Sequence, residues 1–139
     1  MKAFIFSFFI ALTFSVQAQN KSTDIVGTWK SQKGDSHITI YNDNGVFYGK
    51  VIWGTGGSTK DVNNPDASLR NRDVIGMVIL KNFRFDGKYE WEGGTIYDPR
   101  NGETYDCIMS LKDGNTLNIR GYVGMSLFGR TEVWTRIKS

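Results

Sequence analysis

Histidine and cysteine supply many nucleophilic and metal-binding sites, and this chain has one of each, His37 and Cys107. They lie in different candidate strands, and His37 is predicted to point outward because Ile38 and Ile40 take the core face. A zinc site normally needs several His or Cys ligands, and a Cys–His pair needs a third group that orients the base. We therefore expect no catalytic residues, no metal and no cofactor, and an enzyme is the function we favour least.

Cys107 alternates with Tyr105 and Met109, which places it on the apolar face of a strand. A single cysteine cannot form an internal disulfide. We expect a buried, inert thiol, with a reactive thiol as the alternative.

Three oxygen-bearing side chains, Asp61, Asn63 and Asp66, fall within six residues and suggest calcium. Their spacing lacks the Gly and the Glu that a standard calcium loop requires. The pattern favours turn-capping side chains around Pro65 instead.

An aromatic set is the feature most suggestive of ligand binding. Trp53, Trp91, Tyr97 and Tyr122 lie in different candidate strands. If they face inward, they line an apolar pocket with a few polar donors, as small-molecule sites usually do. The same side chains could instead fill a narrow barrel solidly. The sequence leaves both alternatives open.

Arg120 completes the tentative ligand-binding set. An inward Arg120 would anchor an anion such as the carboxylate of a fatty acid. Its alternation with Leu117 and Ile119 favours an outward position on the surface.

Strands must position all of these side chains. The chain has 139 residues and a formal net charge of +3, which is too small to indicate nucleic acid as a partner. Sixteen glycines and a period-two alternation of apolar residues indicate short strands. The candidate strands are Ile25–Ser31, His37–Tyr41, Val46–Trp53, Met77–Phe85, Lys88–Glu92, Gly94–Tyr97, Thr104–Leu111, Thr116–Val123 and Thr131–Ile137.

Four tight-turn dipeptides separate neighbouring candidate strands: Asn44-Gly45, Asp86-Gly87, Asn101-Gly102 and Asp113-Gly114. They predict an all-β, antiparallel up-and-down meander. A meander of about eight to ten strands without helical cover most economically closes into a barrel, since closure removes its raw edges. A two-sheet sandwich is the alternative.

One connection, Gly54–Gly76, is long and contains no convincing strand. Asn64 is predicted to cap a short helix with Pro65 at its first position. We consider two roles for this loop, a lid over the barrel mouth and a plain connector.

Residues 1–18 have the pattern of a secretory signal peptide, with Lys2, an apolar stretch and Val16-Gln17-Ala18 before the cleavage point. The barrel domain then covers residues 19–139. We expect an exported monomer without stable membrane insertion, in the periplasm or else secreted.

Gly27-Thr28-Trp29 opens the first strand and Trp134-Thr135-Arg136 closes the last. This arrangement resembles the lipocalin and wider calycin pattern, which implies that Trp29 and Arg136 seal the closed end of the barrel beside Gly27. An indole filling the narrow end under a stacked guanidinium is physically sound. Arg130 is a competitor for the sealing role.

Nearly the whole remaining chain resembles a family of small exported bacterial proteins known only as a domain of unknown function. The resemblance implies a lipocalin-like barrel in the bacterial envelope and no established activity. The matching segments are Tyr48–Val51, Asp61–Asp66, Leu69-Arg70, Gly93–Pro99, Gly102–Tyr105, Arg120–Gly124 and Gly129–Thr131.

We therefore predict a non-catalytic protein that binds a small apolar or amphipathic molecule. The alternative is a filled barrel that docks on another envelope protein through its surface or through the loop Met125–Phe128. Leu127 and Phe128 could also fold inward and stopper one end of the barrel.

Overall fold

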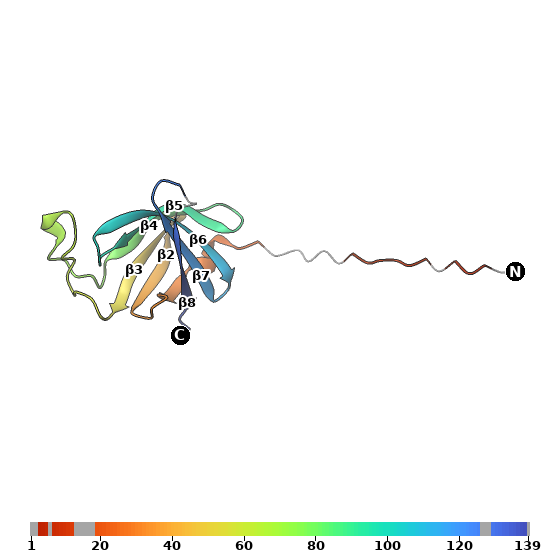
Figure 1. Cartoon of the computed structure of the whole chain (residues 1–139), viewed down its shortest axis with the longest axis horizontal. Helices are drawn as coiled ribbons and strands as arrows, with labels where there is room; N and C mark the ends of the chain where they lie inside the picture. Colours follow the sequence, from red (N-terminus) through yellow and green to blue (C-terminus); the bar gives the residue numbers. More distant parts are fainter. Residues whose placement is uncertain (1–2, 6, 13–18, 126–128, 139) are drawn as a thin grey trace.

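The computed structural model describes residues 3–5, 7–12, 19–125 and 129–138. Eight strands form a closed antiparallel barrel in sequence order, and β1 pairs with β8 to complete the ring. The predicted meander and its closure are confirmed, and a sandwich is excluded. The strands are β1 (Gly27–Lys30), β2 (Ser36–Asp43), β3 (Val46–Gly54), β4 (Val78–Phe85), β5 (Glu90–Asp98), β6 (Glu103–Asp113), β7 (Thr116–Tyr122) and β8 (Arg130–Arg136) (Figure 1).

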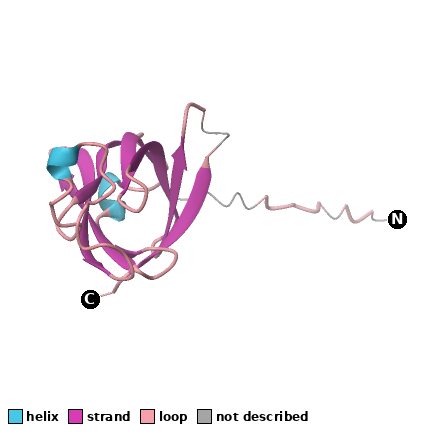
Figure 2. Ribbon diagram, turned by 60° about the vertical axis from the view of Figure 1, so that its left-hand side comes forward, coloured by secondary structure: helices cyan, strands magenta, loops and turns pink. Residues whose placement is uncertain are grey.

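In an up-and-down barrel, alternate connections lie at the same end. The β2–β3, β4–β5 and β6–β7 turns share one end with the N-terminal segment, and we call this the corked end. The β1–β2 turn, the long loop between β3 and β4, the β5–β6 turn and the β7–β8 connection share the other, the open end. Figure 2 brings forward the side that carries the long loop and shows the strands closing a ring.

A β-bulge explains the one miscounted strand. Lys88–Glu92 and Gly94–Tyr97 were expected as separate strands, but they form the single strand β5. The pairing with β6 shifts register between Trp91 and Gly94, and Gly93 takes a φ of +76° there. Glycine adopts this left-handed conformation easily, so the strand bends without ending.

A 3-10 turn, η1 (Ser22–Ile25), crosses the corked end and corrects the expectation that Ile25 begins a strand. The indole N–H of Trp29 donates to the Ile25 carbonyl at 3.0 Å, and that of Trp91 donates to the Ser22 carbonyl at 3.1 Å. These bonds satisfy carbonyls that a short turn leaves unpaired. We call η1 together with Trp29 and Arg136 the cork. Its turn η1 is hydrogen-bonded to two indoles buried in the core.

Arg136 completes the cork. Its guanidinium carbon lies 4.3 Å from the centre of the fully buried Trp29 ring. It also donates to the carbonyls of Asp24 and Val26 in the N-terminal segment and to that of Gly114 in the β6–β7 turn. The predicted closure by Trp29 and Arg136 is confirmed.

The cork depends on two further sequence features. A Cβ at Gly27 would collide with the Arg136 guanidinium as its hydrogen bonds hold it, and the φ of +141° also favours glycine. Arg130, the competing candidate for the sealing role, begins β8 at the open end and is exposed.

Large side chains fill the interior. Phe47 packs edge-on against Trp91 at 6.5 Å between ring centres, and Phe85 lies 4.7 Å from the same ring. The other buried apolar side chains are Ile25, Trp29, Ile38, Ile40, Val51, Met77, Ile79, Leu80, Phe83, Cys107, Met109, Leu117, Ile119 and Trp134. The N-terminal residues do not contribute, since the large apolar side chains described between positions 4 and 12 are at least 75% exposed.

Candidate functional site

The long loop is fixed to the outside of the barrel by Asp61, whose side chain is fully buried. The Tyr97 hydroxyl donates to one carboxylate oxygen at 2.6 Å. Asn64 and Arg72 donate to the other oxygen at 2.8 and 2.9 Å. We call Asp61, Asn64, Arg72 and Tyr97 the loop clamp.

Strand alternation places Tyr97 on the outer face, because its neighbour Ile96 pairs with the buried Leu80 on the inner face. The loop therefore covers the outer wall of the barrel at this point. The prediction of an inward Tyr97 is wrong. The loop also lacks the anchoring expected of a lid, since its clamp grips the wall and not the mouth.

A second contact ties the loop to the β5–β6 turn. The Asn63 side-chain amide donates to the carbonyls of Pro99 and Arg100 at 3.2 and 3.0 Å. A Cβ on Gly102 would collide with the Asn63 carbonyl, and Gly102 has a φ of +74°. Only glycine meets both conditions.

The loop clamp alters the ionisation of its two acidic groups. Burial alone would raise the pKa of Asp61, but the hydrogen bonds from Tyr97, Asn64 and Arg72, with the Arg72 charge, hold it below the usual range. Burial, the hydrogen bond to Asp61 and its negative charge raise the pKa of Tyr97 to about 12. Asp61 therefore stays ionised and Tyr97 stays protonated at neutral pH.

The short helix in the loop starts later than predicted. The 3-10 turn η2 spans Ala67–Leu69, and Asp66 caps it by accepting from the Ser68 amide at 3.0 Å. Asn64 cannot be the cap, because its side chain is already bonded to Asp61 and to the Asp66 amide. Of the three oxygen-bearing side chains, only Asp66 caps a turn. The turn-capping role predicted for Asp61 and Asn63 is wrong, because Asp61 binds Tyr97 on the barrel wall and Asn63 binds the β5–β6 turn. Among the described residues, no three His, Cys, Asp or Glu gather closely enough to hold a metal ion.

Trp53 faces the opposite way from the prediction. It is 40% exposed, and its ring lies 4.5 Å from that of His37 on the outer face. A register shift sets Val51 opposite Ile38 but Trp53 opposite His37, so Ile52 is an extra residue in the ladder. The alternation inverts at this bulge, and Trp53 turns outward.

The other predicted pocket residues do not share a cavity either. Trp91 is inward but fully buried in the core. Tyr122 and Arg120 alternate with the buried Ile119, which places both on the outer face. An inward Tyr122 is therefore wrong, whereas the outward Arg120 agrees with its alternation. Arg120 donates to the Thr131 hydroxyl at 3.0 Å.

Cys107 is buried, as predicted, and burial raises its pKa to about 12 against the opposing effect of a backbone hydrogen bond. A thiol with this pKa is almost wholly protonated at neutral pH, so it is a poor nucleophile. His37 lies on the outer wall beside Trp53. The structure therefore does not bring these two side chains together.

Two hollows stand out in the described part of the molecule, and neither lies inside the barrel. One, of about 440 Å³, lies at the corked end. The other, of about 360 Å³, is a shallow groove beside the stacked outer rings of Tyr41 and Tyr48. A deep pocket lined by the predicted aromatic set is not present among these hollows.

Exposed apolar side chains gather at the open end. Ile52 and Ile75 are 45% and 52% exposed, and backbone hydrogen bonds between Val51 and both Gly76 and Met77 hold their segments side by side. Trp53, Val123 and Met125 at the same end are also exposed, as are Val62 and Leu69 in the part of the long loop that lies against the outer wall. The outermost residues Leu127 and Phe128 lie outside the described residues. We call Ile52, Trp53 and Ile75 the apolar rim.

Charged groups lie at the same end of the barrel as the apolar rim. Arg100, in the β5–β6 turn, is paired with Asp98 at 3.1 Å. The hydrogen bond to Asp98 raises the pKa of Arg100 against its partial burial, and the charges of Asp98, Glu132 and Asp35 add to it. Glu132 and Asp35 come from β8 and from the β1–β2 turn, on the far side of the ring. The open end thus combines the apolar rim with charged side chains from opposite sides of the barrel.

Sequence reasoning missed both the loop clamp and the apolar rim. Asp61 and Tyr97 are 36 residues apart, and no local pattern joins them. The rim residues follow no period, because they lie at a bulge and in a loop. The only available signal was that Asp61–Asp66 and Gly93–Pro99 both belong to the segments that carry the family resemblance.

An antiparallel eight-stranded barrel corked by an N-terminal 3-10 turn, a tryptophan and an arginine defines a lipocalin-like protein. Within this class the chain belongs to DUF2147, a family of uncharacterized proteins conserved in bacteria, whose model matches residues 27–136. It is similar to the solved structure of HP1028 from the human pathogen Helicobacter pylori, a protein of the lipocalin family. The two are 28% identical, with a TM-score of 0.74 over 82% of this chain and 83% of that one. No curated protein matches the chain.

Proposed function

We propose that this protein is an exported, non-catalytic binding protein that takes up a small apolar or amphipathic molecule at its open end. The observation that supports this proposal is the uneven distribution of exposed apolar side chains. The apolar rim lies at the open end, whereas the corked end is closed by hydrogen-bonded polar groups. Exposed apolar clusters on soluble domains commonly mark binding surfaces.

The neighbouring charges favour an amphipathic ligand. An apolar portion would cover Ile52 and Ile75, and a polar portion would lie toward Arg100 and Glu132. The ligand would rest in and around the mouth, since the core side chains around Trp91 pack the barrel beneath it. The similarity to a lipocalin-family structure is consistent with binding, and neither that structure nor the matching family identifies a ligand.

A second candidate function is docking on another envelope protein. The packed core favours it, because neither of the two hollows of the described residues lies inside the barrel, which leaves the outer surface for a contact. The same apolar rim would form the contact.

Residues 1–18 would direct export to the periplasm, and the mature chain would act as a monomer. Within the described residues, no helix has the length and apolarity needed to cross a bilayer.

Binding of the fluorescent amphiphile 1-anilinonaphthalene-8-sulfonate to the exported chain tests the proposal. Ile52→Ser and Ile75→Ser should each weaken binding about threefold to tenfold, because each removes apolar area from the rim. Val133→Ser is the matched control, since Val133 is 40% exposed, close to the 45% of Ile52, but lies on the β8 wall. Equal losses in all three variants would contradict a site at the open end.

Native mass spectrometry of the protein purified from its own envelope fraction separates the two candidates. A co-purified small molecule that is lost in Ile75→Ser supports the first. A bare mass, with a protein partner that Ile75→Ser releases, supports docking.

A further inference from the structure

The dipeptides that turn the chain between strands also have the residue types that form succinimide rings. In this reaction the backbone nitrogen of a glycine attacks the side-chain carbonyl carbon of the preceding Asn or Asp, and glycine has no side chain to hinder the approach. The structure makes the four sites unequal, because it holds their reacting groups to different degrees. They are Asn44-Gly45, Asp86-Gly87, Asn101-Gly102 and Asp113-Gly114.

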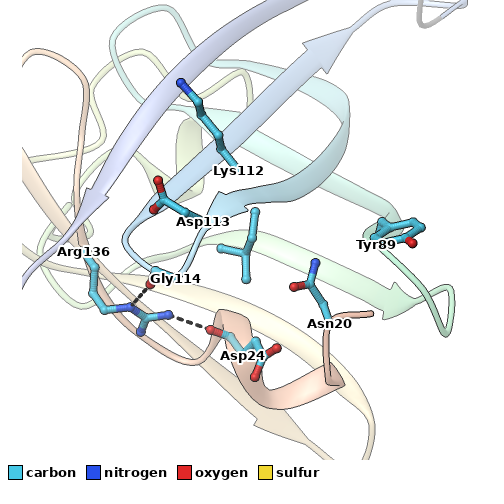
Figure 3. A pocket seen from close by; sticks show the side chains of 8 residues that line it. Asn20, Asp24, Tyr89, Lys112, Asp113, Gly114 and Arg136 are labelled. Atoms are coloured by element: carbon cyan, nitrogen blue, oxygen red, sulfur yellow. Dashed lines mark hydrogen bonds between the residues drawn. The ribbon is translucent and has the colours of Figure 1, made fainter. Parts of the chain in front are cut away.

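The two aspartates are protected by ionisation. A side-chain oxygen of Asp86 accepts from three backbone amides of its own turn, at 2.7, 2.9 and 3.1 Å. An oxygen of Asp113 accepts from the Asn115 amide at 2.9 Å, in the β6–β7 turn drawn in Figure 3. Mainly through these backbone hydrogen bonds, the pKa of both carboxyl groups is held below its usual range. An ionised carboxylate is a poor electrophile, so neither aspartate reacts readily at neutral pH.

Asn101 is an amide and is a better electrophile, but its side chain is held at both ends. Its NH₂ group donates to the Tyr105 hydroxyl at 3.1 Å, and its oxygen accepts from the Glu103 amide at 2.9 Å. The attacking nitrogen, that of Gly102, donates to the Asp98 carbonyl at 2.8 Å. The long loop also packs against Gly102, where a Cβ would collide with a loop carbonyl.

Asn44 is held much less firmly. The hydrogen bond that the described residues offer its side chain runs from its NH₂ group to the neighbouring Asp43 carboxylate at 3.2 Å. Apart from chain neighbours, nothing lies within 4 Å of a Cβ built on Gly45. The Gly45 nitrogen donates to the side-chain oxygen of Asn42 at 2.8 Å, and all three of Asn42, Asn44 and Gly45 are exposed. A small local opening of this turn therefore frees both reacting groups.

We propose that Asn44 is a site of spontaneous deamidation in the exported chain. The Gly45 nitrogen bonds to the Cγ carbon of Asn44 and loses its proton, and the side-chain nitrogen leaves as ammonia. Water then opens the succinimide ring at either carbonyl and gives aspartate or isoaspartate, without any oxidant, reductant or cofactor. Each product adds a negative charge beside Asp43, and isoaspartate also inserts a methylene group into the backbone of the β2–β3 turn.

Ageing of the purified exported chain in mildly alkaline buffer, followed by mass spectrometry of tryptic peptides, tests this proposal. Trypsin places the two asparagines in separate peptides, residues 34–50 and 101–112, so Asn101 is an internal control. Deamidation raises the peptide mass by the difference between a hydroxyl and an amino group, and fragmentation locates the change. Asn44 should convert about tenfold faster than Asn101, because an additional hydrogen bond and the packed loop restrain Asn101.

Variants of the β2–β3 turn then test the role of each group. Asn44→Gly is the control, because glycine keeps the φ of +51° and lacks the reacting side chain, so position 44 should not convert. Asn42→Ala removes the acceptor that holds the Gly45 nitrogen and should speed conversion of Asn44 about threefold to tenfold. Asn42→Asp keeps an acceptor oxygen and should stay within about twofold of the wild-type rate.

Three results would overturn the proposal: equal conversion of the two asparagines, faster conversion of Asn101, or an Asn44 that stays intact in the folded chain while a free peptide of residues 34–50 deamidates beside it. None of them bears on the proposed function, because the β2–β3 turn lies at the corked end and the apolar rim at the open end.

Discussion

The hydroxyl of Tyr97 donates to the buried carboxylate of Asp61 across 2.6 Å, and this contact joins the long loop to the barrel wall. Arg72 reinforces it by pairing with the same carboxylate while its guanidinium lies 5.9 Å from the centre of the Tyr97 ring. The loop carries one member of the apolar rim, Ile75. The loop clamp therefore positions part of the proposed binding surface.

Asp61→Asn should lower the free energy of unfolding by about 1–3 kcal/mol, because it removes the charge that three donors surround. Asp73→Asn is the control in the same loop. Its ion pair with Lys60 is largely exposed, so its loss should cost less than about 1 kcal/mol. Urea denaturation measures both values, and equal losses would contradict the clamp.

Acid should release the clamp. The folded pKa of Asp61 lies below its ordinary value of 3.8, so its contribution is present above that value and is lost as the pH falls through the folded pKa. The difference in unfolding free energy between wild type and Asp61→Asn should be constant above about pH 5 and shrink below 3.8. Taking the difference cancels the other carboxylates. A gap that does not shrink at all between about pH 5 and about pH 2 would contradict this assignment.

Gly102→Ala should destabilise the protein more than Gly87→Ala. Both glycines have positive φ, +74° and +89°, so both variants carry a similar backbone cost of about 1 kcal/mol. Only at Gly102 does the new Cβ meet the Asn63 carbonyl, whereas nothing lies within 4 Å at Gly87. Thermal unfolding should show an extra loss of about 1–3 kcal/mol for Gly102→Ala. Equal losses of unfolding free energy in the two variants would mean that the loop does not pack against this turn.

Three buried tryptophans allow a comparison of their indole N–H groups. Trp29 and Trp91 each donate to a carbonyl of η1, whereas the buried Trp134 N–H finds no partner among the described residues. Replacing each by Phe removes similar volume, but only the first two variants also break a hydrogen bond. Trp29→Phe and Trp91→Phe should be about 1–2 kcal/mol less stable than Trp134→Phe. A reversed order in chemical denaturation would contradict the role of the cork.

The repeating features of the fold could be predicted from the sequence. Alternating apolar residues and the turn dipeptides predict the meander. Closure into a barrel then follows, because it removes the unpaired strand edges. Trp29 and Arg136 could be paired in advance because they open and close the ring, so closure alone brings them together.

The errors arise where a single residue breaks the period. The bulge at Ile52 inverts the alternation of inward and outward side chains. Strict alternation along the strand therefore predicts an inward Trp53, although this side chain lies on the outer face. Gly93 looks like the end of a strand but only bends it. Tyr97 was expected inside because the loop residue that buries it from outside, Asp61, is remote in sequence.

Because Cys107 is fully buried and has a raised pKa, the rate at which a thiol reagent modifies it measures how often the barrel opens. A thiol-specific dye cannot modify this sulfur in the folded barrel. Labelling therefore requires an opening that exposes β6 to solvent. In an oxidising compartment the same shielding keeps the lone sulfur from forming mixed disulfides with other chains. The folded barrel is thereby insulated from redox exchange, and only a chain still on its way to the folded state is vulnerable to it.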